Sequence, residues 1–165
     1  MSFLSNEIYK ICLASVPIVS VDVIILNHSL DKILLFKRNN KPLDGVFYTL
    51  GGRTLKNESI IDTAIRKLKE EAGIIMYRMD LFWGGVTEEY YKGSIYKDVD
   101  THNVNIFYGY IAPKNLGFQI DTQHSQYQWF DITSHDFHPH VRYKLNMILN
   151  SNSFISNSGI INVQG

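Results

Sequence analysis

Glycines and carboxylates occur together in the stretch from Gly51 to Ile74, GGRTLKNESIIDTAIRKLKEEAGI. The stretch begins with two glycines and ends with two adjacent glutamates, Glu70 and Glu71. A glycine turn lets a backbone carbonyl approach a ligand closely, and carboxylates supply the oxygen ligands that hard cations such as Mg²⁺ prefer. The stretch therefore indicates a metal site beside a glycine turn, although a solvated charged face is the commoner explanation for such residues.

A helix is predicted to follow the two glycines. Its apolar residues recur at helical spacing and form one stripe, made of Ile61, Ile65, Leu68 and Ala72. Asn57 or Ser59 can cap the first turn, and Gly73 suits the left-handed position that ends a helix. A second face carries Thr63, Lys67, Glu70 and Glu71 at similar spacing. We therefore expect a strand, a glycine turn and a helix that together present carboxylates beside an approachable backbone.

The spacing from Gly52 reads G-x5-E-x7-R-K-L-K-E-E-A-G-I. It is similar to the signature of the Nudix hydrolase family, G-x5-E-x7-R-E-U-x-E-E-x-G-U, in which U is an apolar residue. Lys67 departs from this signature because it replaces the first glutamate of the R-E-U-x-E-E core. The resemblance implies the Nudix fold, of class α/β (α+β), in which a mixed β-sheet lies between helices. It also implies Mg²⁺-dependent hydrolysis of a nucleoside diphosphate linked to another group.

The resemblance implies roles for the residues of this Nudix motif (51–74). A backbone carbonyl of Gly51 or Gly52 and the carboxylate of Glu71 would bind the metal ion, with Glu70 as a further candidate. Structural tasks would fall to Gly73 at the end of the helix and to Glu58 and Arg66, which would pair and hold the loop on the helix.

The lysine at position 67 bears on the number of metal ions. Lys67 lies one turn before Glu71 and is close enough to pair with it. A lysine there makes several Mg²⁺ ions unfavourable and favours a single ion. Weakened activity is the competing interpretation.

Several stretches outside the motif resemble GDP-mannose mannosyl hydrolases, a Nudix branch that lacks the same glutamate. The similar stretches are Val19–Asp22, Lys37–Pro42 with Gly45, Arg53 after the two glycines, and Asp121–Trp129. This resemblance implies hydrolysis of a nucleotide sugar at the sugar carbon C1 with inversion, giving GDP and a free hexose. It implies one Mg²⁺ ion per site, for which Mn²⁺ can substitute. Gln123 would be a further metal ligand, and His124 would be the general base.

The chemistry of the residue types agrees with these implied roles. An unperturbed imidazole titrates near ~6.5, so a neutral His124 can take a proton from water near neutral pH. Arg38 can neutralise the β-phosphate of the leaving GDP through its forked guanidinium. Asp22, Arg53 and Tyr127 would contact the substrate together with Arg38.

Two departures from the mannosyl hydrolase pattern leave the identity of the substrate undetermined. Glu89 and Asn103 stand where that branch has a histidine and a tyrosine. An acid at Glu89 would repel phosphate unless it turns to a hydroxyl group or a metal ion. Two alternatives therefore stay open: a Nudix pyrophosphatase that cleaves at phosphorus with Glu88 or Glu89 as a ligand, and a weakly active module that binds a nucleotide sugar.

The rest of the chain predicts strands on both sides of the motif and a helix near each end. Strand-like stretches are Ile18–Leu26, Ile33–Lys37, Val46–Leu50, Leu81–Tyr91, Val104–Ile111 and Gln128–Phe130. Helical spacing marks Phe137–Leu149 and the first sixteen residues, where Leu4, Ile8, Ile11 and Cys12 share one face. Asp22 lies inside the first strand and is costly to bury without a partner, so an edge position facing water is one expectation.

Two further groups of residues could bind a metal ion. Asp98, Asp100 and His102 lie in a polar loop, and His135, His138 and His140 lie near the start of the last helix. A solvated loop and an ordinary polar helix start are the favoured explanations.

Length and composition favour one compact domain over residues 1–165, with a core at about 16–150 and a tail at 151–165. Sixteen Lys and Arg residues balance sixteen Asp and Glu residues, so no overall field favours nucleic acid or a membrane surface as a partner. Cys12 is the single cysteine and cannot form an internal disulfide, which fits a cytoplasmic protein. The resemblance also implies that the protein is a homodimer and that its substrate is a nucleotide sugar.

Overall fold

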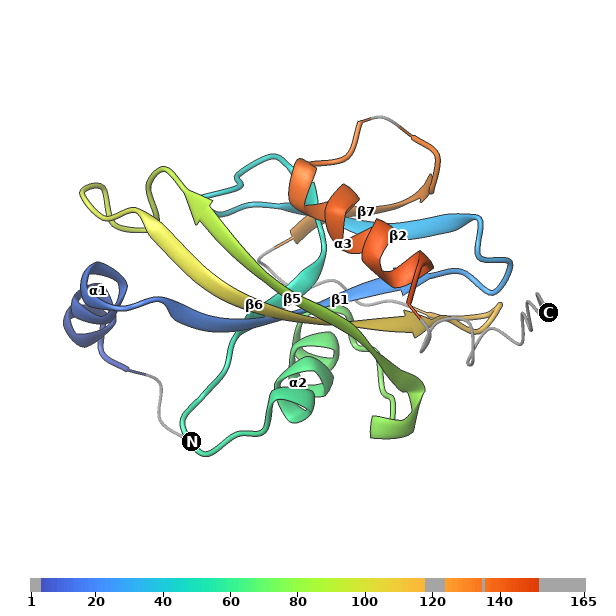
Figure 1. Ribbon diagram of the computed structural model, residues 1–165, viewed down its shortest axis with the longest axis horizontal. Helices are drawn as coiled ribbons and strands as arrows, with labels where there is room; N and C mark the ends of the chain where they lie inside the picture. Colours follow the sequence, from blue (N-terminus) through green and yellow to red (C-terminus); the bar gives the residue numbers. More distant parts are fainter. Residues whose placement is uncertain (1–3, 118–123, 135, 152–165) are drawn as a thin grey trace.

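The computed structural model describes residues 4–117, 124–134 and 136–151. A mixed β-sheet forms the middle layer, and helices cover both of its faces (Figure 1). The predicted α+β arrangement of a mixed sheet between helices is confirmed. None of the helices in these residues is long and apolar enough to span a bilayer.

The sheet contains seven strands within the described residues. They are β1 (Ile18–Leu26), β2 (Lys32–Arg38), β3 (Phe47–Tyr48), β4 (Leu50–Arg53), β5 (Leu81–Tyr91), β6 (Thr101–Ile111) and β7 (His124–Asp131). Strand β1 pairs in parallel with β6 and antiparallel with both β2 and β4. Strand β1 is therefore central, and the strands that carry the predicted site residues are arranged around it.

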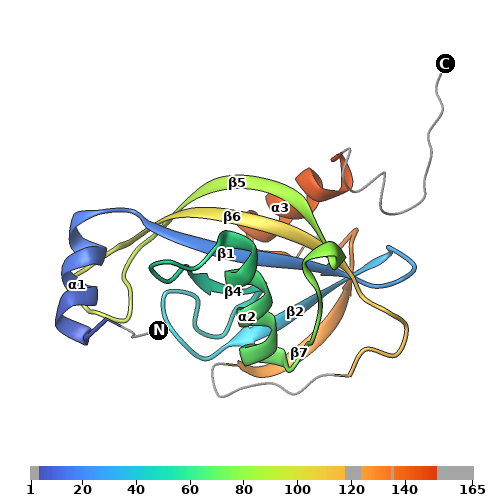
Figure 2. The same ribbon diagram turned by 90° about the horizontal axis from the view of Figure 1, so that it is seen from below.

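Helices α2 (Ile60–Ala72) and α3 (Pro139–Leu149) lie on opposite faces of the sheet (Figures 1 and 2). Alternate residues of β1 supply the two cores because successive side chains of a strand point to opposite faces. Val21, Val23 and Ile25 pack in the cluster that includes Ala64, Leu68 and Ala72 of α2. Ile24 and Leu26 pack in the cluster that includes Val141, Leu145 and Ile148 of α3.

Helix α2 forms as its sequence predicts. Ser59 is the residue that caps it, and the Ser59 hydroxyl accepts a hydrogen bond of 3.2 Å from the backbone N–H of Asp62. At the other end Gly73 adopts the left-handed conformation, with φ of 65°, and donates its N–H to the carbonyl of Lys69. Backbone hydrogen-bonding groups at both helix ends thus find partners in nearby residues of the chain.

Two expectations about strands are wrong. Residues 46–50 do not form one strand, because the chain passes from the edge of β2, where Phe47 and Tyr48 pair, to the edge of β1, where Leu50–Arg53 pairs. Asp22 does not occupy an edge position facing water. It lies on central strand β1 and is only 6 % exposed, because a lysine from α3 reaches it across the fold.

The N-terminal helix, α1 (Asn6–Ser15), lies at one end of the sheet beside the loop that joins β5 and β6 (Figures 1 and 2). The hydroxyl of Tyr96 in that loop donates a 2.8 Å hydrogen bond to the carbonyl of Asn6. The apolar face expected for this helix is not buried, since Leu4, Ile8 and Ile11 are 47 %, 50 % and 64 % exposed. Leu13 is instead the residue that α1 buries.

Candidate active site

A cavity of about 400 Å³ brings together five of the residues predicted to bind the metal ion or the substrate, although Glu70 and Glu71 are not among the residues that line it. Strands β1, β2 and β4 and helix α2 contribute Asp22, Arg38, Gly51, Gly52, Arg53 and Lys67 to its wall. Helix α1 contributes Tyr9 and Leu13. Cavities of this size typically hold small molecules or cofactors. We therefore take this cavity as the candidate active site.

Gly51 is required by the close packing of β4 against β1, and Gly52 lies against the side chain of Lys67 on α2. Gly51 pairs with Asp22 across β1, and a Cβ atom at Gly51 would collide with the carbonyl oxygen of Val21 and the carboxylate of Asp22. A Cβ atom at Gly52 would lie 2.6 Å from Cε of Lys67. The missing side chains therefore let β4 approach both β1 and α2.

The two adjacent glutamates of the motif have different surroundings. Glu71 is 2 % exposed, and its Oε2 accepts a 3.3 Å hydrogen bond from the backbone N–H of Gly51. Its Oε1 forms an ion pair with Lys67, so the pairing expected from the sequence is present. The side chain of Glu70 is 44 % exposed and pairs with Arg66 at 3.1 Å. Glu71 is thus the carboxylate at the glycine turn.

These donors fit one hard cation better than several. Among the described residues no three His, Cys, Asp or Glu side chains come close enough to form a metal cluster. Glu71 and a carbonyl of Gly51 or Gly52 are oxygen donors, which suits Mg²⁺ with water completing its shell. An ion bound there would supply positive charge to a diphosphate. The ammonium of Lys67 already neutralises Glu71 and opposes a second cation.

Glu58 and Arg66 form the pair expected from the motif. Nε and Nη2 of Arg66 donate to the two carboxylate oxygens of Glu58 at 2.6 and 2.9 Å. Glu58 also accepts from the backbone N–H of Leu55 at 3.1 Å, and Arg66 donates to the carbonyl of Arg53 at 3.3 Å. The hydrogen bonds from Arg66 lower the pKa of Glu58 to about 2. The pair therefore ties the loop after β4 to helix α2.

Arg38 has a fixed backbone and an unsatisfied side-chain donor. Its N–H donates to the carbonyl of Val46 at 3.0 Å, and its carbonyl accepts from Gly45 at 2.8 Å. Its Nε is buried without a hydrogen-bond partner among the described residues, although the side chain lines the cavity. Buried donors normally have partners, so an anion in the cavity would complete this guanidinium. Arg53, on the same wall, lies with its guanidinium 4.1 Å from the ring centre of Tyr9.

The floor of the cavity holds an ion cluster that the sequence analysis missed. Lys144 of α3 is fully buried, and its ammonium contacts Asp22 and, at 2.5 Å, Oε1 of Glu89. The hydroxyl of Tyr91 donates to Oε2 of Glu89 at 2.7 Å, so Glu89 turns to hydroxyl groups as well as to the lysine. The signal was present in the spacing of α3, because position 144 falls on the same face as Val141, Leu145 and Ile148.

The pKa values of the two carboxylates in this cluster are shifted in opposite directions. Burial raises the pKa of Asp22, and the charge of Lys144 counteracts this effect only in part. Burial would raise the pKa of Glu89 too, but Lys144 and Tyr91 outweigh it and hold the pKa of Glu89 below its usual value. Glu89 therefore keeps its charge more readily than Asp22, and its carboxylate is already engaged by Lys144 and Tyr91. The other alternative ligand, Glu88, is 63 % exposed and lies 3.7 Å from His102.

Three predicted residues belong to the segment around β7. Gln123 and the side chain of His124 lie outside the described residues. The backbone of His124 pairs with Arg38 across β2 and β7, so the expected base and the expected phosphate ligand are on neighbouring strands. Tyr127 is 44 % exposed, its ring packs 6.0 Å from that of Phe36, and it is not among the described residues that line the cavity.

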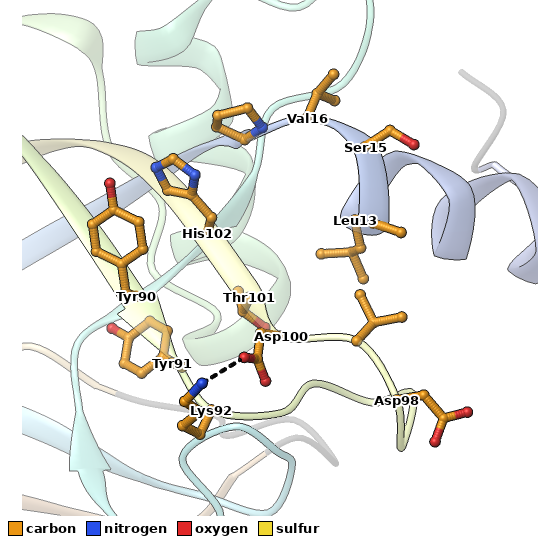
Figure 3. A pocket seen from close by; sticks show the side chains of 13 residues that line it. Leu13, Ser15, Val16, Tyr90, Tyr91, Lys92, Asp98, Asp100, Thr101 and His102 are labelled. Atoms are coloured by element: carbon orange, nitrogen blue, oxygen red, sulfur yellow. Dashed lines mark hydrogen bonds and ion pairs between the residues drawn. The ribbon is translucent and has the colours of Figure 1, made fainter.

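A second cavity, of about 580 Å³, lies between the end of α1 and the loop that joins β5 to β6 (Figure 3). It shares Leu13, Tyr91 and Thr101 with the first cavity. Asp100 points to Lys92 and pairs with it at 3.1 Å, while Asp98 and His102 point elsewhere (Figure 3). Asp98, Asp100 and His102 therefore form no metal site.

Two of the three clustered histidines pack on the ion cluster rather than around a metal ion. The rings of His138 and His140 stack with centres 5.2 Å apart, and both pack against Tyr91. Burial and the neighbouring His140 lower the pKa of His138, which favours a neutral ring. His135 lies outside the described residues.

A profile of the NUDIX domain matches residues 16–148. The chain belongs to the Nudix family. The matched range includes the motif, Lys144 of α3 and the residues of the strands and of α2 that line the cavity, but not those of α1. The protein is therefore a Nudix hydrolase, and Nudix hydrolases act on small-molecule substrates and generally use divalent metal ions such as Mg²⁺.

Two curated relatives and a solved structure are similar to this Nudix chain. The low-salt glycan biosynthesis protein Agl8 of Haloferax volcanii is 30 % identical over 139 residues, which are 82 % of this chain and 85 % of that protein. The ADP-ribose pyrophosphatase of Methanocaldococcus jannaschii is 42 % identical over 59 residues, which are 36 % of this chain and 34 % of that protein. The MutT NUDIX hydrolase from Burkholderia pseudomallei aligns with a TM-score of 0.64 at 21 % identity, over 79 % of this chain and 97 % of that one.

Replacing Glu58 with glutamine should destabilise the protein in a pH-dependent manner. The pKa of Glu58 is lowered from an ordinary value of 4.5 to about 2, so its charge stabilises the fold above pH 4.5 and ceases to do so as pH falls toward 2. The loss in unfolding free energy at pH 7 should be on the order of 3 kcal/mol, because one pKa unit corresponds to about 1.4 kcal/mol. Urea denaturation at several pH values between 7 and 3 measures the gap between wild type and variant.

Glu70→Gln is the matched control, since it removes a more exposed partner of the same arginine. Its cost should stay below about 1 kcal/mol, as for other exposed ion pairs. A gap for Glu58→Gln that does not shrink as the pH falls would contradict the assigned role of the pair.

Proposed function

We propose that this Nudix hydrolase cleaves a nucleotide sugar in the manner of a GDP-mannose mannosyl hydrolase, releasing GDP and a free hexose. The observation that carries the proposal is the buried Nε of Arg38, which lines the cavity beside Gly51 and has no partner among the described residues. A diphosphate would supply that partner. The similarity to a glycan biosynthesis protein supports a sugar-linked substrate.

Each predicted residue then has a defined task. Arg38 and Arg53 would hold the diphosphate, and Glu71 with a glycine carbonyl would hold one Mg²⁺ ion, for which Mn²⁺ can substitute. His124 would take a proton from the water that attacks C1 on the face opposite the leaving GDP, which inverts the configuration. Arg38 would neutralise the β-phosphate, and a Mg²⁺ ion bound at Glu71 would add positive charge there, so GDP could leave without a dedicated acid.

Cleavage at phosphorus is the second candidate. The observation in its favour is the match of 42 % identity over 59 residues to an ADP-ribose pyrophosphatase. Both reactions need the same diphosphate site, so they differ in the atom that water attacks. The products of the reaction distinguish attack at C1 from attack at phosphorus.

The products of GDP-mannose hydrolysis test the proposal. We expect GDP and free mannose, with the label from heavy-oxygen water found in the mannose and not in a phosphate. Chromatography identifies the nucleotide product, and mass spectrometry locates the label. GMP with mannose 1-phosphate, or label in a phosphate, would instead assign the protein to the pyrophosphatases. A panel of nucleotide sugars with other bases, including ADP-ribose, extends the same assay to the choice of substrate.

Replacing His124 with glutamine tests whether His124 is the general base. We expect kcat to fall by roughly 10²–10⁴-fold, as is typical when a general base is removed, with KM changed little. Steady-state kinetics on the substrate found above measures both constants. His28→Gln is the control, since His28 is exposed in the turn between β1 and β2. A rate for His124→Gln close to that of wild type would remove His124 from the mechanism.

Replacing Lys67 tests the proposal of one metal ion. Lys67→Gln frees Glu71 from its ammonium and should tighten Mn²⁺ binding, while Lys67→Glu should raise the number of bound ions from one to two. Electron paramagnetic resonance of free Mn²⁺ measures affinity and stoichiometry without reference to turnover. Lys69→Gln, on the exposed side of the same helix, should leave both unchanged. Identical Mn²⁺ binding by wild type and both Lys67 variants would show that Lys67 does not set the ion count.

A further inference from the structure

The buried lysine of α3 has no donor left for a ligand. Lys144 is completely buried, and its ammonium contacts the carboxylates of Asp22 and Glu89 and, at 3.4 Å, the hydroxyl of Tyr48. An ammonium has three N–H donors, and three protein acceptors take them. Lys144 can therefore act on a substrate only through the groups that it holds.

The two carboxylates held by Lys144 line the cavity but differ in their other partners. Glu89 also accepts hydrogen bonds from the hydroxyls of Tyr48 and Tyr91, so both of its oxygens are occupied. Lys144 and Thr49 both donate to Oδ2 of Asp22, and among the described residues its Oδ1 accepts no hydrogen bond. This Oδ1 lies in the space that a side chain at Gly51 would fill. Because position 51 is a glycine, Asp22 can keep this place in the wall of the cavity that both residues line.

A second acceptor on the cavity wall belongs to β6. Asn105 of β6 is 1 % exposed and lines the same cavity. Its amide nitrogen donates to Ser20 at 2.9 Å, but its Oδ1 is buried without a partner in the described part of the chain. A buried acceptor without a donor is costly unless a ligand completes it. The floor of the cavity is therefore rich in acceptors.

The chemistry of this floor selects one class of ligand group. Phosphate oxygens would be repelled by the carboxylates of Asp22 and Glu89, whereas a hydroxyl group would donate to Asp22 in a charge-assisted hydrogen bond. We propose that Lys144 is a positioning residue for sugar recognition, which is anchored by Glu89 and holds Asp22 so that Asp22 and Asn105 accept hydrogen bonds from the hydroxyl groups of the hexose. This inference rests on the proposed nucleotide-sugar substrate and assigns the sugar to the floor of the cavity.

Binding of two ligands that differ by the sugar alone tests this assignment. GDP-mannose and GDP are titrated by calorimetry in EDTA, where metal-dependent turnover cannot proceed. In Lys144→Met the Kd for GDP-mannose should rise at least about tenfold while that for GDP stays within about twofold, because a site built on hydrogen bonds loses selectivity when its acceptors are misplaced. An effect on folding alone would weaken both ligands equally.

Glu89→Gln is the second variant, since it removes one charge of the cluster without leaving two carboxylates unpaired. It should raise the Kd for GDP-mannose selectively as well, even if Lys144→Met does not fold. Lys69→Met, an exposed lysine on α2, is the control and should bind both ligands like wild type. A ratio of the two Kd values that is unchanged in a folded Lys144 or Glu89 variant overturns the inference. This binding result is independent of which bond wild type cleaves, so failure of the proposed reaction is recognised separately by its products.

Discussion

The antiparallel pairing of β4 with β1 is the constraint on which the site depends. It places Gly51 opposite Asp22 and Gly52 opposite Val21, and the approach of β4 to β1 excludes a side chain at Gly51. Strand β1 also pairs with β2, which ends at Arg38, and with β6, where Asn105 lies opposite Ser20. The packing of β4 therefore explains the glycines without reference to a ligand. Their approachable backbone, which suits a metal ion, follows from the packing that the sheet requires.

The ions on the cavity floor are better explained by recognition than by stability. Removing two carboxylates and an ammonium from water is expensive, and replacing a buried ion pair by well-packed apolar residues is often neutral or stabilising. The face of α3 that carries Lys144 is otherwise apolar, with Val141, Leu145 and Ile148 fully buried. A leucine at position 144 would suit that face but would leave the carboxylates of Asp22 and Glu89 without a counter-charge.

The parts that could be predicted from sequence are those fixed by neighbours in the chain. The bounds of β1 and the capped helix α2 follow from alternation, helical spacing and the local signals at Ser59 and Gly73. The interior position of Asp22 could not be read in the same way, because its partner Lys144 lies 122 positions later in the chain. Residues 46–50 were misread as one strand because their switch from β2 to β1 depends on sheet order. Residue types pointed to Arg38 and Gly51, whereas their convergence in one cavity required the fold.

Positive and negative charges lie on different parts of the cavity surface, and this separation can orient a ligand. Arg38, Arg53 and Lys67 place positive charge on the wall formed by β2, β4 and α2, while the floor carries two carboxylates against one lysine. A ligand with an anionic half and a hydroxyl-bearing half fits these charges in one orientation. Its diphosphate would lie against the Nudix motif and its ring against the floor, so that the bond between sugar and phosphate lies where the two regions meet. In the proposed reaction the base would come from the start of β7, the strand that pairs with β2 beside Arg38, and would activate water on the face of the sugar opposite the leaving group.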